Sequence, residues 1–157
     1  LIADDAALRR RFAEDGYLFL RGVLDRDEVL TARHEVLRRM AEVGEIAAPV
    51  EAAQPTGTSR RAEMHPDLGA FWRSVSEGPA VRRAVHGARA RAVAAKLLDR
   101  PVRPFDFLWL RAMLAGRASP LHFDHVYMNR GTDRVVTTWI PLGDVTDRKS
   151  TRLNSSH

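Results

Sequence analysis

Apolar residues at helical spacing dominate the first part of the chain. A first helical segment, with Leu8 and Phe12 one turn apart, stops at Gly16. A second helix is predicted after Asp25, because Asp25 and Glu28 have the spacing of a capping box. The apolar stripe of this second helix consists of Val29, Val36, Leu37 and Met40, and it ends near Gly44. Two amphipathic helices are therefore expected before residue 45.

Helical spacing returns after a segment rich in turn-forming residues. Residues 45–60 have no clear period and are predicted to be a loop, which serves either as a lid over a substrate or as an ordinary surface connection. Beyond it, His65 is expected in a turn, and apolar residues at helical spacing predict core packing. These are Met64, Leu68, Phe71 and Trp72. Pro79 then suits the first turn of a helix whose apolar face continues to Leu98.

The apolar period changes from helical to two at Val102. Alternation up to Leu114 predicts a strand that is buried on both faces. A short buried strand is expected at Tyr17–Leu20, and further strands are expected from His122 onward and from Arg134 to Ile140. Helices followed by successive strands indicate the α+β class.

Arg111 interrupts the apolar row of the strand that begins at Val102. A buried guanidinium requires an anionic partner. Arg111 is therefore expected either to hold a carboxylate of a cosubstrate or substrate, or to form a structural ion pair with Asp106 or Asp124.

The strongest candidate for chemistry is the stretch Leu121-His122-Phe123-Asp124-His125-Val126-Tyr127. On an extended strand, His122 and Asp124 leave the same face, so an imidazole and a carboxylate can bind one divalent first-row metal. A second histidine would complete the two-histidine, one-carboxylate triad of non-haem Fe(II) oxygenases. His125 is expected on the opposite face, as a surface or supporting residue. His-x-Asp alone is a weak signal, because the spacing is common by chance.

The surroundings of His122 and Asp124 strengthen this signal. Residues 122–132 and Thr137-Thr138-Trp139-Ile140-Pro141-Leu142-Gly143-Asp144-Val145 together resemble the phytanoyl-CoA dioxygenase family of Fe(II)/2-oxoglutarate oxygenases. The resemblance extends to Phe12-Ala13-Glu14-Asp15-Gly16-Tyr17-Leu18 and to Arg21-Gly22-Val23-Leu24. It is dense from Leu108 to Val145 and loose from Gly44 to Pro101.

The resemblance implies helices packed on an incomplete double-stranded β-helix, or jelly roll. It implies Fe(II) and 2-oxoglutarate as cofactors, with His122 and Asp124 as metal ligands and Trp139 lining the 2-oxoglutarate pocket. Tyr127 is expected near the mouth of the site, where its phenol either bonds a ligand or packs. The reaction implied is hydroxylation of a small organic or acyl substrate, coupled to decarboxylation of 2-oxoglutarate to succinate.

Two functional residues of the family have no match in this sequence. These are the distal histidine and the arginine that anchors the far carboxylate of 2-oxoglutarate, both expected after Val145. Residues 147–157 lack any apolar period and resemble the translation of a sequencing adapter, so His157 is not considered a ligand. Residues 1–146 are accordingly interpreted as the N-terminal part of one oxygenase domain. The fragment itself is expected to be inactive.

Charge and composition argue against several other classes. The formal charge of +5 becomes +3 when residues 147–157 are set aside, and the arginines are scattered, so nucleic-acid binding is not expected. The absence of cysteine excludes disulfides and thiolate metal sites and fits a cytoplasmic location. There is no apolar run of membrane-spanning length. A small molecule is the expected partner, and the oligomeric state is left open.

Three hypotheses follow from the sequence. The first is a truncated 2-oxoglutarate-dependent hydroxylase, and the second is a jelly-roll module that binds a metal or ligand without oxygenase activity. The third, a basic interaction protein, requires salt-sensitive binding to nucleic acid. Motif, spacing and flanking residues favour the first hypothesis.

Overall fold

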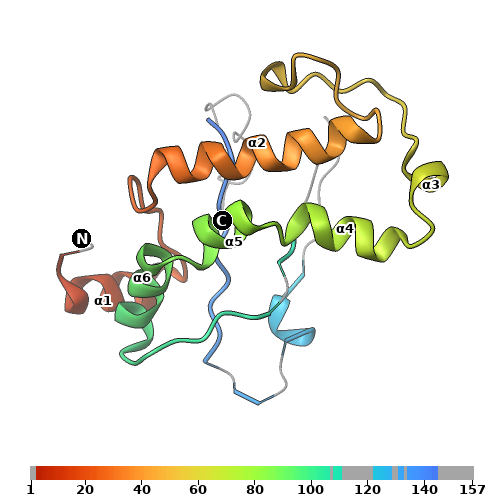
Figure 1. The fold of residues 1–157 in the computed structure, drawn as a ribbon. Coiled ribbons are helices and arrows are strands. Elements are labelled where there is room, and N and C mark those ends of the chain that lie inside the picture. Colours follow the sequence, from red (N-terminus) through yellow and green to blue (C-terminus); the bar gives the residue numbers. More distant parts are fainter. Residues whose placement is uncertain (1–2, 107, 111–121, 129–130, 133, 145–157) are drawn as a thin grey trace. The chain divides into compact units, whose positions relative to one another are not determined.

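The computed structural model is helical, and it describes residues 3–106, 108–110, 122–128, 131–132 and 134–144 (Figure 1). Along the chain it contains α1 (Asp5–Asp15), α2 (Arg26–Glu42), the 3₁₀ helix η1 (Val50–Ala52), α3 (Arg61–Met64), α4 (Leu68–Ser76), α5 (Pro79–His86), α6 (Ala88–Leu98) and the 3₁₀ helix η2 (Asp124–Val126). Within these ranges no helix has both the length and the apolar character needed to cross a membrane.

The described residues form two compact units. Unit 1 contains the described residues of Leu1–Leu24 and Val85–Thr138, and unit 2 contains those of Asp25–Ala84 and Trp139–His157. The candidate metal ligands His122 and Asp124 belong to unit 1.

The expected jelly roll is absent from the part of the chain that the structure describes. No β-strand occurs there, and the one bridge is an isolated antiparallel pair between Ile46 and Pro55. The prediction of an α+β fold with helices packed on a double-stranded β-helix is therefore wrong. A strand persists only where its backbone groups pair with a neighbouring strand, and the predicted strand segments form no such ladder in these residues.

The strand predicted at Tyr17–Leu20, which was expected to be short and buried, is not formed. Tyr17 is 63% exposed and Phe19 is 71% exposed, so the expected burial does not occur. The guanidinium of Arg21 instead lies over the ring of Phe19, 5.0 Å from its centroid. Residues 102–106, 108–110 and 134–140 are likewise irregular, and the remainder of the strand predicted from Val102 to Leu114 lies outside the described residues.

Unit 1 is built on the packing of α1 against α6, which lie side by side in Figure 1. Asp4 caps α1, and Gly16 ends it in the left-handed conformation with φ of 74°. Leu8 is fully buried. Arg9 ties the two helices together, because its Nη1 donates to the carbonyl of Lys96 at 2.9 Å and lies 3.2 Å from Asp99 Oδ1.

Unit 2 is built on α2, which begins where the sequence predicted. Asp25 is the N-cap, and its Oδ1 accepts hydrogen bonds from the backbone N–H groups of Asp27 and Glu28 at 3.0 and 3.2 Å. Helix α2 packs against α4 and η1. The buried side chains of unit 2 are Ala32, Met40, Val43, Phe71, Val75, Ala80, Val81 and Ala84.

The predicted continuous helix from Pro79 to Leu98 is instead two helices. Helix α5 starts at Pro79 as expected, but it ends at His86, and Gly87 is the extended N-cap of α6 with ψ of 173°. Gly78 has no side chain with which to cap α5. Glu35 of α2 serves instead, because its Oε2 accepts hydrogen bonds from the backbone N–H groups of Ala80 at 2.7 Å and Val81 at 3.2 Å.

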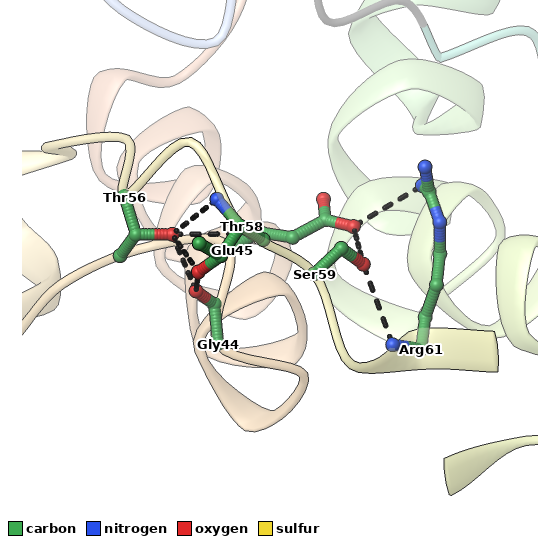
Figure 2. Close-up of polar contacts among 6 residues, drawn as sticks. All are labelled: Gly44, Glu45, Thr56, Thr58, Ser59 and Arg61. Carbon is green, nitrogen blue, oxygen red and sulfur yellow. Dashed lines mark hydrogen bonds and ion pairs between the residues drawn. The ribbon is translucent and has the colours of Figure 1, made fainter. Parts of the chain in front are cut away.

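The loop predicted at residues 45–60 is held by its own side chains (Figure 2). Thr56 Oγ1 donates to the carbonyl of Gly44 at 2.5 Å, and Ser59 Oγ donates to Glu45 Oε1 at 2.5 Å. Arg61 Nη1 lies 3.2 Å from the same Glu45 oxygen. These contacts hold the segment against its own flanking residues, and its role as a lid or as an ordinary surface connection stays a prediction.

Candidate metal site

The side chains of His122 and Asp124 lie together in unit 1. The Nε2 atom of His122 is 3.3 Å from Oδ1 of Asp124, and the two side chains are 36% and 32% exposed. An imidazole nitrogen and a carboxylate oxygen are thus adjacent and accessible to solvent.

A turn, rather than the predicted strand, brings these two groups together. Asp124 is the first residue of η2, and its carbonyl accepts from the backbone N–H groups of Tyr127 at 2.9 Å and Met128 at 3.1 Å. Val126 N–H donates to the carbonyl of Phe123 at 3.3 Å. The chain therefore turns at Asp124. The prediction that His122 and Asp124 share the face of a strand is wrong, because the backbone here forms a turn and not a strand.

Thr137 is the functional candidate that sequence reasoning missed. Its Oγ1 donates a hydrogen bond to Oδ2 of Asp124 at 2.8 Å, across 13 residues of sequence. The sequence placed Thr137 only within an alternating strand. Neither spacing nor composition indicates this contact, because it depends on how the chain returns after the turn.

The donor set fits a divalent first-row metal. Ligand bonds from imidazole nitrogen and carboxylate oxygen are about 2.1 Å long. Two such ligands at angles between those of octahedral and tetrahedral sites are therefore about 3.0 to 3.4 Å apart. The observed 3.3 Å between His122 Nε2 and Asp124 Oδ1 lies within this range. An ion pair between the same two groups has a similar separation.

The described part of the chain supplies two donors to this site. No group of three or more His, Cys, Asp or Glu side chains suited to a metal is found among the described residues. A facial triad requires a third protein ligand.

The other predicted site residues have separate outcomes. Tyr127 follows η2 and is 69% exposed. Trp139 is 75% exposed and belongs to unit 2. Arg111 lies outside the described residues. Their roles at a 2-oxoglutarate or substrate site therefore stay predictions.

The apolar residues next to His122 and Asp124 in the sequence have side chains exposed to solvent. Phe123 is 80% exposed and Val126 is 65% exposed. The surface hollow of about 380 Å³ lined by Arg11, Asp15, Tyr17, Leu18 and Phe19 shares no lining residue with this pair.

A second His-x-Asp sequence, at His65 and Asp67, provides an internal comparison. Asp67 is the N-cap of α4, where its Oδ1 accepts from the backbone N–H of Ala70 at 2.9 Å. The His65 ring stacks against Phe71 with centroids 4.7 Å apart. Both side chains have structural roles here, so identical spacing produces no converging pair of donors.

No protein-family model, curated protein or solved structure matches this chain. Evidence for function therefore comes from the residues and from the geometry of the His122–Asp124 pair.

Proposed function

We propose that this chain belongs to a non-haem Fe(II)/2-oxoglutarate-dependent oxygenase that hydroxylates a small organic or acyl substrate. In this proposal His122 and Asp124 are metal ligands. The observation that carries it is the 3.3 Å approach of His122 Nε2 to Asp124 Oδ1. The sequence around this pair resembles the phytanoyl-CoA dioxygenase family, and this resemblance is the reason for proposing iron as the metal and 2-oxoglutarate as the cosubstrate.

The protein's own part in this chemistry is to present a neutral imidazole and a carboxylate on one side of a turn. Iron(II) with open coordination positions would supply the activation of O₂ and the coupled oxidation of 2-oxoglutarate. His122 provides a nitrogen ligand and Asp124 an anionic oxygen ligand that offsets part of the metal charge. The exposed side chains of Phe123, Val126 and Tyr127 offer apolar surface to an organic substrate.

A second candidate is a metal-binding module without oxygenase activity. It needs no residue beyond the two donors that the structure brings together, His122 and Asp124. Both candidates require metal binding by His122 and Asp124. They differ in whether 2-oxoglutarate is consumed.

The test of metal binding uses conservative changes of the two ligands. We expect Asp124→Asn and His122→Gln each to weaken Co(II) or Fe(II) binding by more than about tenfold, because each change removes a ligand. Isothermal titration under anaerobic conditions measures the dissociation constants. The wild-type affinity is expected to be modest, since two protein ligands bind a metal less tightly than three.

The second His-x-Asp sequence supplies matched controls. Asp67→Asn keeps an N-cap residue on α4, and His65→Gln changes a ring that packs on Phe71. Both control variants should bind the metal as the wild type does. Equal binding by the wild type and by Asp124→Asn would contradict the proposal.

Consumption of 2-oxoglutarate separates the two candidate functions. The measurement is Fe(II)-dependent formation of succinate from 2-oxoglutarate by the parent protein, with and without Asp124→Asn, because residues 1–146 alone are expected to be inactive. Succinate formation that requires Asp124 supports the oxygenase. Metal binding without any succinate formation supports the module that lacks oxygenase activity.

A further inference from the structure

The carboxylate of Asp124 has a different partner on each oxygen. Oδ1 lies 3.3 Å from His122 Nε2, and Oδ2 accepts the hydroxyl of Thr137 at 2.8 Å. The Thr137 contact is a hydrogen bond to a charged acceptor, which is stronger than a bond between neutral groups. One oxygen is therefore engaged by the protein while the other faces the imidazole.

The orientation of a carboxylate decides how it binds a metal. The Asp124 side chain is partly exposed and lies on a short turn, where two side-chain torsions would otherwise leave it free to rotate. A hydrogen bond to Oδ2 restricts both torsions. It also occupies the oxygen whose participation would make the carboxylate a two-oxygen ligand.

We propose that Thr137 is a positioning residue that fixes the Asp124 carboxylate, so that Oδ1 alone is presented beside His122 for a metal. This inference rests on the proposed metal site at His122 and Asp124. Hydrogen-bond partners of ligating carboxylates commonly change metal affinity by about 10- to 100-fold when they are removed. Thr137 is thus expected to contribute to affinity without touching the metal.

The test replaces the Thr137 hydroxyl with a group of the same shape. Thr137→Val removes the donor and keeps the branched side chain, and Thr137→Ser restores the donor. In the full chain, we expect Thr137→Val to raise the Co(II) dissociation constant by about tenfold or more. Thr137→Ser should stay close to the wild-type value. Anaerobic titration calorimetry gives both values without depending on catalysis.

The adjacent residue Thr138 supplies the matched control. It is exposed like Thr137, so Thr138→Val makes the same chemical change in the same segment. Thr138→Val should bind Co(II) as the wild type does. The visible absorption spectrum of bound Co(II) should change in Thr137→Val alone, because Oδ2 becomes available to the metal there.

The outcomes distinguish this inference from the proposed function. If the wild type binds Co(II) and Thr137→Val binds it equally well with the same spectrum, Thr137 has no positioning role and the metal site still stands. Equal losses in Thr137→Val and Thr138→Val would also overturn the inference, since they would reflect the segment rather than one hydroxyl. If the wild type binds no Co(II), the proposed function fails and the inference fails with it.

Discussion

Asp4 shows how a single exposed side chain makes a helix sensitive to pH. Its Oδ1 accepts the backbone N–H of Ala7 at 2.9 Å at the start of α1. This hydrogen bond favours the carboxylate and lowers the pKa of Asp4 below its ordinary value. Because the folded pKa lies below the unfolded one, the cap is fully effective above the unfolded pKa of about 3.9. Its contribution is lost as the pH falls through the folded value.

We therefore expect the first turn of α1 to fray as the pH falls below about 4. Asp4→Asn should cap the helix without this pH dependence, because the amide oxygen accepts the same bond and does not titrate in that range. Proton NMR of the Ala7 and Leu8 amides across the acid range measures the effect. An identical acid response in the wild type and in Asp4→Asn would show that the Asp4 carboxylate is not responsible.

At the same scale, the sequence anticipated part of the candidate site. The side chains of His122 and Asp124 do meet, as the sequence suggested, although the expected reason, a shared strand face, was wrong. The sequence did not anticipate that a turn rather than a strand holds them, nor that Thr137 bonds the carboxylate. Both facts depend on the path of the chain between positions 124 and 137, which no local pattern records.

At the scale of the element, α5 depends on a residue from another helix. Glu35 occupies the place of an N-cap side chain that Gly78 lacks. A Cβ atom added at Gly78 would lie 2.6 Å from Glu35 Cδ and Oε1. The absence of a side chain at position 78 thus leaves room for the carboxylate that caps α5.

This arrangement predicts strong coupling between positions 35 and 78. Glu35→Ala should lower the free energy of unfolding by about 1 to 2 kcal/mol, the usual effect of losing a helix cap. Gly78→Ala should cost a similar amount, because the new methyl group displaces the same carboxylate. In the double variant the costs should not add. Urea denaturation of the four proteins measures the cycle.

Glu35→Gln is the control for this cycle. Its amide oxygen still accepts from Ala80 and Val81, so it should cost less than Glu35→Ala. Additive effects of Glu35→Ala and Gly78→Ala would mean that the two positions act independently.

Helix boundaries that depend on a single local residue were predictable from the sequence. Asp25 before α2, Gly16 after α1 and Pro79 at the start of α5 each act through their own conformation or local hydrogen bonds, and each lies where the sequence placed it. The predicted strands failed for a complementary reason. The apolar run at Tyr17–Leu20 and the alternation at 134–140 each describe a single segment, but a strand also needs a paired neighbour, and neither pattern specifies one.

At the scale of the whole molecule, the positive charge is interleaved with acidic side chains. Most of the ion pairs among the described residues involve arginine. They include Arg9–Asp99, Arg11–Asp15, Arg38–Glu42, Arg60–Glu63, Arg61–Glu45 and Arg82–Glu77. Many arginines of the described residues are therefore paired with nearby acidic groups, and the formal charge of +5 is the excess of basic over acidic residues in the whole sequence. Affinity for a polyanion requires several uncompensated cations in one row.

We accordingly expect no appreciable binding of double-stranded DNA at about 0.2 M salt. Fluorescence anisotropy of a labelled duplex, titrated with the full chain at about 0.05 and 0.2 M salt, measures this. Tight binding with a steep dependence on salt would revive the hypothesis of a basic interaction protein.

The two His-x-Asp sequences also bear on how such patterns are searched for in genomes. One short pattern occurs twice in 157 residues. Asp67 already accepts a hydrogen bond from the first turn of α4. Asp124 is instead the first residue of a 3₁₀ turn, and its carboxylate lies beside the imidazole of His122. A search that first discards aspartates standing directly before a helix would remove the former occurrence and retain the latter. Such a filter asks whether the aspartate oxygen already accepts a hydrogen bond from the first turn of a helix.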